Sequence, residues 1–294
     1  MGARLRVLSF TAVAILVLVA SILVQPASGQ VGLSTFVLDL VVLPGRVTRD
    51  ALTLTNNGEK AQYIRIEAVD WVPTGPSMQS YVAPGSLERS ISAWLDFWPS
   101  ETTIEPGENI QVQVELTAPS SARGSYWGML FVKLLPSSSP VETGETQAQV
   151  GMVVVLGVAI YADAGGGESQ GRIIGFSYEP LDPDRQMLFT VKFEDTGITR
   201  LRPTGTIQIR DEGGDIVRKL MLPQFTSLPD TNQHLQVPLT RVPSERPGVE
   251  NPEPVEPEPP LPPGTYLAIA IIDYGGDALV AAQLPFEIED NAPD

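Results

Sequence analysis

The residue types that most often carry out chemistry are scarce in this chain. It contains no cysteine and one histidine, His234. Without cysteine there is no thiolate nucleophile and no thiolate ligand for zinc or an iron–sulfur cluster. A single imidazole cannot supply the histidine pairs that transition metals favour, and His234 points opposite to Leu235 in a predicted strand, which predicts a solvent-facing residue. We therefore expect no cofactor and no metal site.

Two short acidic segments are the remaining candidates for a site. Residues 211–215 combine three acidic residues with two glycines, as calcium loops do, and Asp182 and Asp184 flank a proline. Both segments are more simply tight turns, because each is only a few residues long and lies between strand-like stretches. The sequence also has no nucleophile elbow, phosphate-binding loop or zinc-binding helix motif. We expect a protein that is not an enzyme.

Composition and charge narrow the remaining classes. Of the 294 residues 43% are hydrophobic and 18% charged, which is typical of a globular protein, and the length favours two domains. The 26 glycines and 27 prolines favour many short elements joined by turns. The formal net charge of −16 repels phosphate backbones, so nucleic acid is not expected as a partner.

Residues 1–29 have the pattern of an export signal peptide. Arg4 and Arg6 precede an apolar run over 7–24, and Ala27 and Gly29 place small residues at the −3 and −1 positions before Gln30. An uncleaved membrane anchor is the alternative, because the apolar run is nearly long enough to span a bilayer. Both interpretations place the rest of the chain outside the cytoplasm, in the periplasm, at the cell surface or in the medium.

Alternation of apolar and polar residues predicts strands throughout the rest of the chain. The clearest run, 110–116, alternates without error. Seven strands are predicted before a glycine-rich stretch and seven after it. They cover 35–42, 48–55, 61–70, 93–98, 109–117, 125–135 and 147–162, and then 172–178, 186–193, 205–210, 215–221, 232–238, 265–273 and 279–288. This pattern predicts an all-β chain of two immunoglobulin-like β-sandwiches in tandem.

An internal repeat supports the same division. Pro106 precedes Leu116 by ten residues, Pro229 precedes Leu239 by ten, and polar-glycine turns lie upstream at 55–58 and 194–197. We expect a first sandwich over 30–163, a flexible glycine-rich linker over 164–171, and a second sandwich over 172–294. Spacing differences place extra length around 71–92 in the first sandwich and a loop at 243–263 in the second.

The two insertions have different compositions. Loop 243–263 is rich in proline and glutamate, and an acidic, solvated surface loop is favoured over a ligand for an aromatic groove. The stretch 71–98 holds Trp71, Trp94 and Trp98 with Tyr81 between them. These aromatic residues form a binding face if they are exposed, whereas burial in the core is the better prediction for Trp94.

Several motifs in the first half resemble a known family. Residues 42–45 with 52–58, then Trp98-Pro99, 104–108, and 124–126 leading to 134–136, are similar in order to the amino-terminal domain of periplasmic pilus-assembly chaperones of the PapD type. The same pattern resembles WxL-associated bacterial cell-surface proteins. The resemblance implies a chaperone in pilus or surface-structure assembly, with a pilin-like or other envelope subunit as its partner. The family holds its partner's terminal carboxylate with an arginine and a lysine. Here the matching positions fall near Leu40 and within 156–161, which contain no cation.

Strand 147–162 is the candidate partner-binding edge. Its alternating apolar residues could complete a partner's sheet through main-chain hydrogen bonds. The alternative is a strand that is buried on both faces of the sandwich or covered by the second domain. A second alternative for the whole chain is a structural or adhesive surface module without chaperone activity. The membrane is a partner only if residues 1–29 are retained. The predicted contact residues are Val150, Met152, Val154, Leu156, Val158 and Ile160.

The signal-peptide hypothesis gives a direct test. Because Ala27 and Gly29 satisfy the small-residue rule, the protein recovered from its native host is expected to begin at Gln30. Intact-mass measurement checks this, and a mass that still includes residues 1–29 would favour the membrane anchor instead.

Overall fold

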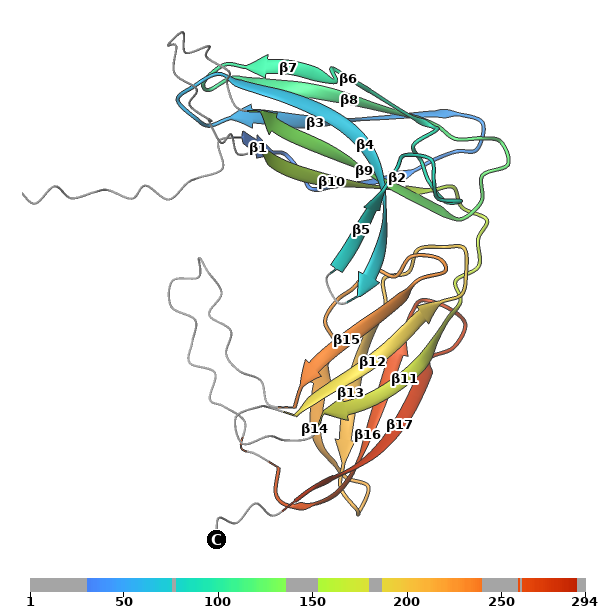
Figure 1. Cartoon of the computed structure of the whole chain (residues 1–294). Coiled ribbons are helices and arrows are strands. Elements are labelled where there is room, and N and C mark those ends of the chain that lie inside the picture. Colours follow the sequence, from blue (N-terminus) through green and yellow to red (C-terminus); the bar gives the residue numbers. More distant parts are fainter. Residues whose placement is uncertain are drawn as a thin grey trace, which may run out of the picture.

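The computed structural model describes residues 31–75, 78–135, 153–179, 187–239, 259 and 261–289. These residues form strands and turns without any helix, and so none of them belongs to a helix able to cross a membrane. Their sheets pack as two β-sandwiches (Figure 1), which confirms the predicted all-β tandem fold. The predicted signal segment 1–29, Asp182 with Asp184, and loop 243–263 apart from 259 and 261–263 lie outside the described residues.

The first sandwich has two facing sheets. One has the strand order β1–β3–β8–β6, and the other has the order β2–β10–β9–β4–β5 with β7 paired to β4. The strands are β1 (Val31–Leu33), β2 (Val37–Val41), β3 (Val47–Asn56), β4 (Gln62–Gly75), β5 (Met78–Val82), β6 (Leu95–Trp98), β7 (Glu101–Ile104), β8 (Asn109–Thr117), β9 (Ser125–Leu135) and β10 (Val154–Asp163).

The second sandwich is smaller. Its sheets have the orders β11–β12–β15 and β14–β13–β16–β17. The strands are β11 (Gly171–Glu179), β12 (Leu188–Asp195), β13 (Thr204–Arg210), β14 (Ile216–Met221), β15 (Asn232–Pro238), β16 (Gly264–Asp273) and β17 (Val280–Ile288).

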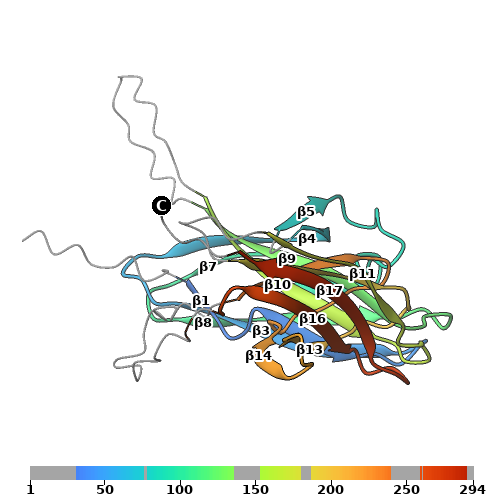
Figure 2. The same cartoon turned by 90° about the horizontal axis from the view of Figure 1, so that it is seen from below.

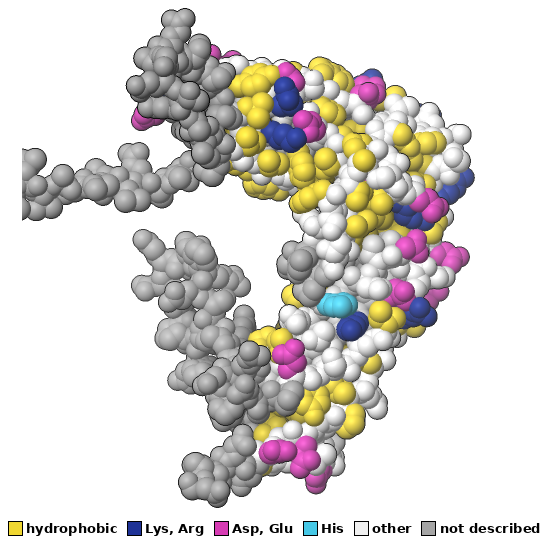
Figure 3. Space-filling view, viewed as in Figure 1, with side chains coloured by type: hydrophobic (Ala, Val, Ile, Leu, Met, Phe, Trp, Pro, Cys, Tyr) yellow, Lys and Arg dark blue, Asp and Glu magenta, His cyan; other side chains and the backbone are white. Residues whose placement is uncertain are grey.

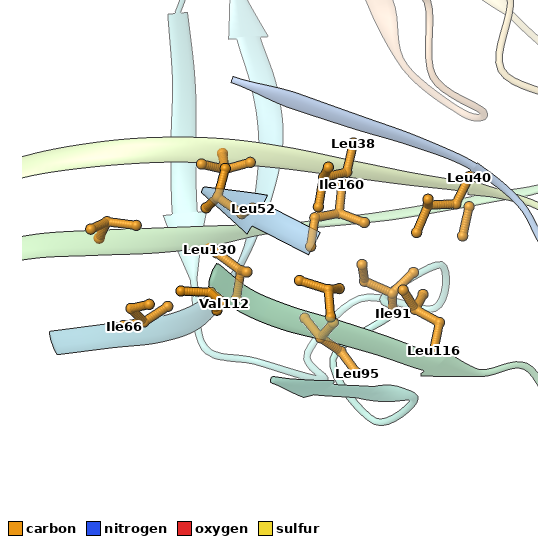
Figure 4. Close-up of a cluster of buried hydrophobic side chains, with 14 of the residues drawn as sticks. Leu38, Leu40, Leu52, Ile66, Ile91, Leu95, Val112, Leu116, Leu130 and Ile160 are labelled. Carbon is orange, nitrogen blue, oxygen red and sulfur yellow. The ribbon is translucent and has the colours of Figure 1, made fainter. Parts of the chain in front are cut away.

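Period-two alternation places one face of each strand in a core. In β8, Val112, Val114 and Leu116 are buried while the residues between them remain at least partly accessible. Their side chains meet residues of the opposite sheet, including Leu130 and Ile160 (Figure 4). Complete burial of such an aliphatic side chain contributes about 1.5–3 kcal/mol, so the two cores are the main source of stability. The second core is separate and is rich in aromatic residues.

The internal repeat is present in the strand register. Leu52 lies opposite Val112 in the β3–β8 pair, and Val191 lies opposite Leu235 in the β12–β15 pair. The sheet connections also correspond, since β9 pairs with β4 and β10 just as β16 pairs with β13 and β17. The two sandwiches are therefore built on one plan.

Three strands were not predicted from the sequence, namely β1, β5 and β7. β1 is only three residues long, and the four residues of β7 are mostly polar and lack an apolar alternation. β5 forms because β4 continues to Gly75, beyond its predicted end at residue 70, and pairs with it as a hairpin. This hairpin accounts for part of the extra length predicted around 71–92.

Asp70 organises the rest of that insertion. Its buried carboxylate accepts hydrogen bonds from the Ser90 and Ser92 hydroxyls, each at 2.7 Å, and from the backbone N–H of Ser86 at 3.1 Å. Residue Ile91, between the two serines, is completely buried in the first core. One carboxylate thus holds a loop that closes the end of the sandwich.

Replacing this carboxylate should be costly. Asp70→Ala leaves the buried Ser90 hydroxyl and the half-buried Ser92 hydroxyl without their partner, so we expect a loss of about 3 kcal/mol in unfolding free energy. The exposed Asp96 on β6 provides the matched control, and Asp96→Ala should change stability by less than about 0.5 kcal/mol. Denaturant unfolding of both variants measures the difference, and equal effects would contradict this role of Asp70.

Candidate functional site

Strand β10 has two halves with different neighbours. Along its whole length, from Val154 to Asp163, it pairs antiparallel with β9. On its other side it pairs parallel with β2, but only from Ala159 to Asp163. Within the described residues no strand pairs with 154–158 on that side. Among the described residues, the first half of β10 is therefore an open sheet edge, and the second half lies inside the sheet.

The backbone at this edge follows a simple alternation. The Ala159 N–H donates to the Phe36 carbonyl at 3.0 Å, and the Asp163 carbonyl accepts from the Val42 N–H at 3.0 Å. Odd-numbered residues therefore direct their N–H and C=O groups toward the side that β2 occupies. By the same alternation, the peptide groups of Val155 and Gly157 point to the open edge, while those of Val154 and Leu156 pair with β9.

The side chains of β10 divide the predicted contact residues into three groups. Val158 and Ile160 are 0% exposed and belong to the core, so the prediction that a partner contacts these two side chains is wrong. Leu156 is half-buried against the same core, and Val154 is 42% exposed. Val150 and Met152 lie outside the described residues. Of the six predicted side chains, Val154 and Leu156 are the two that the structure places at the open edge.

The molecule bends at the junction of the two sandwiches. Figure 1 shows the β4–β5 hairpin projecting from the first sandwich toward the second, near β15. The space-filling view shows a concave side between the sandwiches (Figure 3). In the view from below, the second sandwich lies in front of the first (Figure 2). The sheet that contains the open edge is the one that faces the second sandwich (Figure 1).

An aromatic cluster fills the junction. Trp71, Trp127 and Met129 from the first sandwich are buried together with Leu228 from the second. The Trp127 indole N–H donates to the Trp71 carbonyl at 2.8 Å, and the rings of Trp71 and Tyr161 meet edge to face. The alternative of an exposed tryptophan face is therefore wrong for Trp71. Trp94 packs against the first core, as predicted, whereas Trp98 and Tyr81 are about half exposed.

Arg200 adds a polar contact beside this cluster. Its guanidinium, whose side chain is 5% exposed, pairs with Asp39 and with Asp163 at 2.9 Å. It also lies 4.2 Å from the centre of the Tyr161 ring. Burial raises the pKa of Tyr161, and the Arg200 charge partly opposes that rise. The second sandwich is thus attached to the strand pair β2–β10, close to where the open edge ends.

The predicted linker 164–171 makes specific contacts at both ends. The Ala164 N–H donates to the Gly124 carbonyl, and the Gly124 N–H donates to the Gly165 carbonyl, both at 2.8 Å. Further along, the Gln170 carbonyl accepts from the Thr196 N–H at 3.0 Å. Independent folding of the two sandwiches stays a prediction, but these bonds join the linker to both of them.

Two arginines that contact the strand pair β2–β10 come from the second sandwich. Leu40 is buried in the core. It lies near the position where the pilus-assembly chaperones that the sequence resembles carry an arginine. Arg200 and Arg202 approach from the other side, and both pair with Asp39. Sequence reasoning missed these residues because their shared partner, Asp39, lies about 160 positions away, and no local pattern marks such a contact.

The other candidate residues in the described part of the chain lie in a turn and on a strand. Residues 211–215 form the tight turn between β13 and β14, in which the Asp211 carboxylate accepts from the Asp215 N–H at 2.9 Å. His234 is half-buried on β15, opposite Lys192 of β12. Among the described residues there is no group of three or more histidine, cysteine, aspartate or glutamate side chains that could hold a metal ion.

Comparison with known proteins finds similarity in structure alone. No family model and no curated protein matches the sequence. The chain is similar to a structure of a chaperone–tip adhesin complex of CFA/I fimbriae biogenesis, with 9% identity and a TM-score of 0.46, covering 86% of this chain and 97% of that one. It is also similar to the YadV chaperone, with 10% identity and a TM-score of 0.42, covering 88% and 100%. For the E. coli chaperone DraB the identity is 12%, the TM-score 0.39 and the coverage 88% and 97%.

The junction can be tested at Gly124. Its φ is +73°, and a Cβ there would lie 2.0 Å from the Ile198 carbonyl oxygen of the second sandwich. Gly107 has nearly the same φ, +75°, but open space around it, which makes it the matched control. We expect Gly124→Ala to lower stability by about 3 kcal/mol in total, against about 1 kcal/mol for Gly107→Ala.

Proteolysis gives a second measurement of the same variants. Displacement of Ile198 should expose the linker, so glutamate-specific protease should cut after Glu168 faster in Gly124→Ala than in Gly107→Ala. Equal stability and equal cutting in the two variants would show that the close contact between Gly124 and Ile198 does not hold the junction.

Proposed function

We propose that this chain is a non-catalytic, extracytoplasmic binding protein with a chaperone-like role. It engages a partner by β-strand addition at the open edge of β10. The partner class that fits is a pilin-like or other cell-envelope subunit that offers an extended segment. The export pattern of residues 1–29 supports a location outside the cytoplasm, and the resemblance of the first half to pilus-assembly chaperones supports the partner class.

The observation that carries this proposal is the half-paired strand. β10 pairs on both sides from Ala159 onward, and 154–158 pair on one side only among the described residues. An exposed strand edge presents unpaired N–H and C=O groups that another chain can use. Such an edge, kept open between a buried core and a concave surface, is a ready template for an added strand.

The side chains around the edge fit the same role. Val154 and Val155 are 42% and 45% exposed, although valine favours burial. Leu156 is half-buried at the border of the core. An added strand with alternating apolar residues would extend the core beyond Leu156 on one face. On the other face, Gly157 has no side chain and the Met129 side chain lies over it, since a Cβ there would be 2.9 Å from the Met129 sulfur, so only a small residue fits beside it. We therefore propose that the partner segment alternates apolar and small or polar residues.

The length of the added strand is limited at one end. The Phe36 carbonyl accepts the hydrogen bond of the Ala159 N–H, so β10 is paired with β2 from that residue onward. A partner strand would end where β2 begins, in line with it. We propose that binding needs no terminal-carboxylate anchor of the family's kind, because Arg200 and Arg202 are both paired with acidic side chains of the first sandwich.

A structural or adhesive surface module is the second candidate. The observation that favours it is the junction, where Trp71, Trp127, Leu228 and the Arg200 ion pairs hold the two sandwiches together. A fixed pair of sandwiches is suited to a spacer. In that role the edge of β10 would have no partner, so one experiment separates the two candidates.

Val155→Pro tests strand addition. The proline ring removes the N–H that points to the open edge and leaves the β9 pairing, which uses the neighbouring residues, in place. We expect the thermal transition to be kept and partner binding to weaken at least about tenfold. Val155→Thr keeps the N–H and is the matched control. Binding is measured by recovering each variant from the native envelope fraction and quantifying the co-purified proteins by mass spectrometry.

The outcomes of this comparison are distinct. A named envelope protein that co-purifies with the native chain and with Val155→Thr, and is lost with Val155→Pro, supports strand addition. If the same protein is recovered equally with all three, the edge is not the binding site. If no protein is enriched with any of them, the surface-module hypothesis replaces the chaperone-like one.

A further inference from the structure

The internal repeat places an asparagine and an aspartate in equivalent buried turns. In the first sandwich, Asn56 ends β3, and in the second, Asp195 ends β12. The Asn56 N–H donates to Glu108 O and its carbonyl accepts from Gly107 N–H, both at 2.9 Å. The Asp195 N–H donates to Thr231 O and its carbonyl accepts from Asp230 N–H, both at 3.1 Å. The backbone geometry of the two turns therefore corresponds bond by bond.

The first side-chain oxygen is also equivalent in the two turns. Asn56 Oδ1 accepts from the Gly58 N–H at 2.9 Å, and Asp195 Oδ1 accepts from the Gly197 N–H at 3.1 Å. Both side chains are 0% exposed. Gly107 and Asp230, which face these turns, even share a left-handed backbone, with φ values of +75° and +58°.

The difference lies in the second side-chain atom. Asn56 Nδ2 donates to the carbonyls of Lys60 and Ile104, each at 2.8 Å. The repeat aligns those two residues with Thr199 and Ser227. Asp195 Oδ2 occupies the corresponding place but is buried with no hydrogen-bond partner among the described residues. The hydroxyls of Thr199 and Ser227 are also buried without a partner, so neither of them compensates this oxygen.

We propose that Asp195 is held as the neutral acid, with its hydroxyl donating a hydrogen bond where the Asn56 amide donates, and that the second sandwich loses stability when this proton leaves. An ionised carboxylate can only accept hydrogen bonds, and a turn built to receive a donor offers it none. A neutral carboxylic acid supplies the missing donor. In the equivalent turn of the first sandwich, the Asn56 amide alone supplies the donor, through its bonds to the Lys60 and Ile104 carbonyls.

The charges around Asp195 agree with this assignment. Burial, with a smaller contribution in the same direction from Asp230 on the loop that contacts the turn, raises the pKa of Asp195 to about 7. The Gly197 N–H and Arg89 of the first sandwich oppose the rise. The preceding residue, Glu194, pairs with Arg172.

The sign of the pH dependence follows from this shift. A carboxyl group with a higher pKa in the folded chain than in the unfolded chain binds its proton more tightly when folded. The contribution of this group to the free energy of unfolding therefore falls as pH rises from about 4 to about 7. Above that range the contribution stays constant. The affected turn leads directly to Ile198 and Arg200, which contact the first sandwich, so loss of the proton also weakens the junction.

Asp195→Asn in the full chain is the main test. The amide supplies the donor at every pH, so we expect the melting temperature of the second sandwich to rise at pH 8 by on the order of 5 °C, with little change at pH 5. In the native protein labelled with ¹³C at aspartate carboxyls, one resonance should titrate near pH 7 and be missing in Asp195→Asn. A reduced melting temperature for Asp195→Asn at pH 8, together with no carboxyl resonance that titrates above pH 6, overturns the proposal.

The reciprocal change in the first sandwich is the matched control. Asn56→Asp should introduce the same behaviour there, with a melting temperature that falls from pH 5 to pH 8 relative to the native chain. Asp230→Asn, at the exposed neighbouring position, should only shift the midpoint of the Asp195 titration downward. If calcium chloride at pH 8 stabilises the native chain but not Asp195→Asn, the carboxylate is ionised and holds a cation, and the proposal is wrong.

Discussion

The parallel pairing of β2 with the second half of β10 is the constraint on which the rest of the molecule depends. These five residue pairs, from Ala159 with Val37 to Asp163 with Val41, place Leu38 and Ile160 in the first core. They also bring Asp39 beside Tyr161 and Asp163, which together receive Arg200 of the second sandwich. Because the pairing stops at Ala159, it defines where the open edge begins. The first core, the junction and the open edge therefore all depend on this short pairing of β2 with β10.

The junction combines two kinds of interaction with different roles. The cluster of Trp71, Trp127, Met129 and Leu228 buries apolar surface, which supplies free energy without fixing a direction. The Arg200 contacts and the close approach of Gly124 to Ile198 are directional and fix the orientation. A junction of this composition resembles a small domain core more than a flexible connection. Gly167 of the linker serves close packing there, since it lies against Thr199 and Ile198, whereas Gly165 has open space around it.

The strands could be predicted wherever one face of the strand is buried and the other is exposed to solvent. β8 and β15 were predicted with the bounds that the structure gives, because their apolar residues alternate without interruption. β1, β5 and β7 could not be predicted, since their pairing depends on neighbours rather than on their own pattern. Periodicity also identified β10 as unusually apolar, but it could not separate Val158, which is core, from Val154, which is exposed. That distinction depends on where β2 ends, and no property of β10 itself encodes it.

The contacts between the sandwiches lay beyond sequence reasoning for a related reason. Asp39 and Arg200 are ordinary charged residues in their local context, and only the folded chain brings them together. The repeat was the one long-range signal in the sequence. It predicted equivalent turns at Asn56 and Asp195 but gave no indication that their side chains would be buried.

The burial of Arg200 has a consequence for how the molecule responds to its surroundings. Dissolved ions screen exposed charge pairs strongly and buried pairs much less. Arg202, which is largely exposed, should lose most of its attraction to Asp39 in concentrated salt, whereas Arg200 should keep its own. In the location proposed above, outside the cytoplasm, the protein would meet ionic strengths that the cell does not control. The angle between the two sandwiches should therefore stay the same from dilute fresh water to brine.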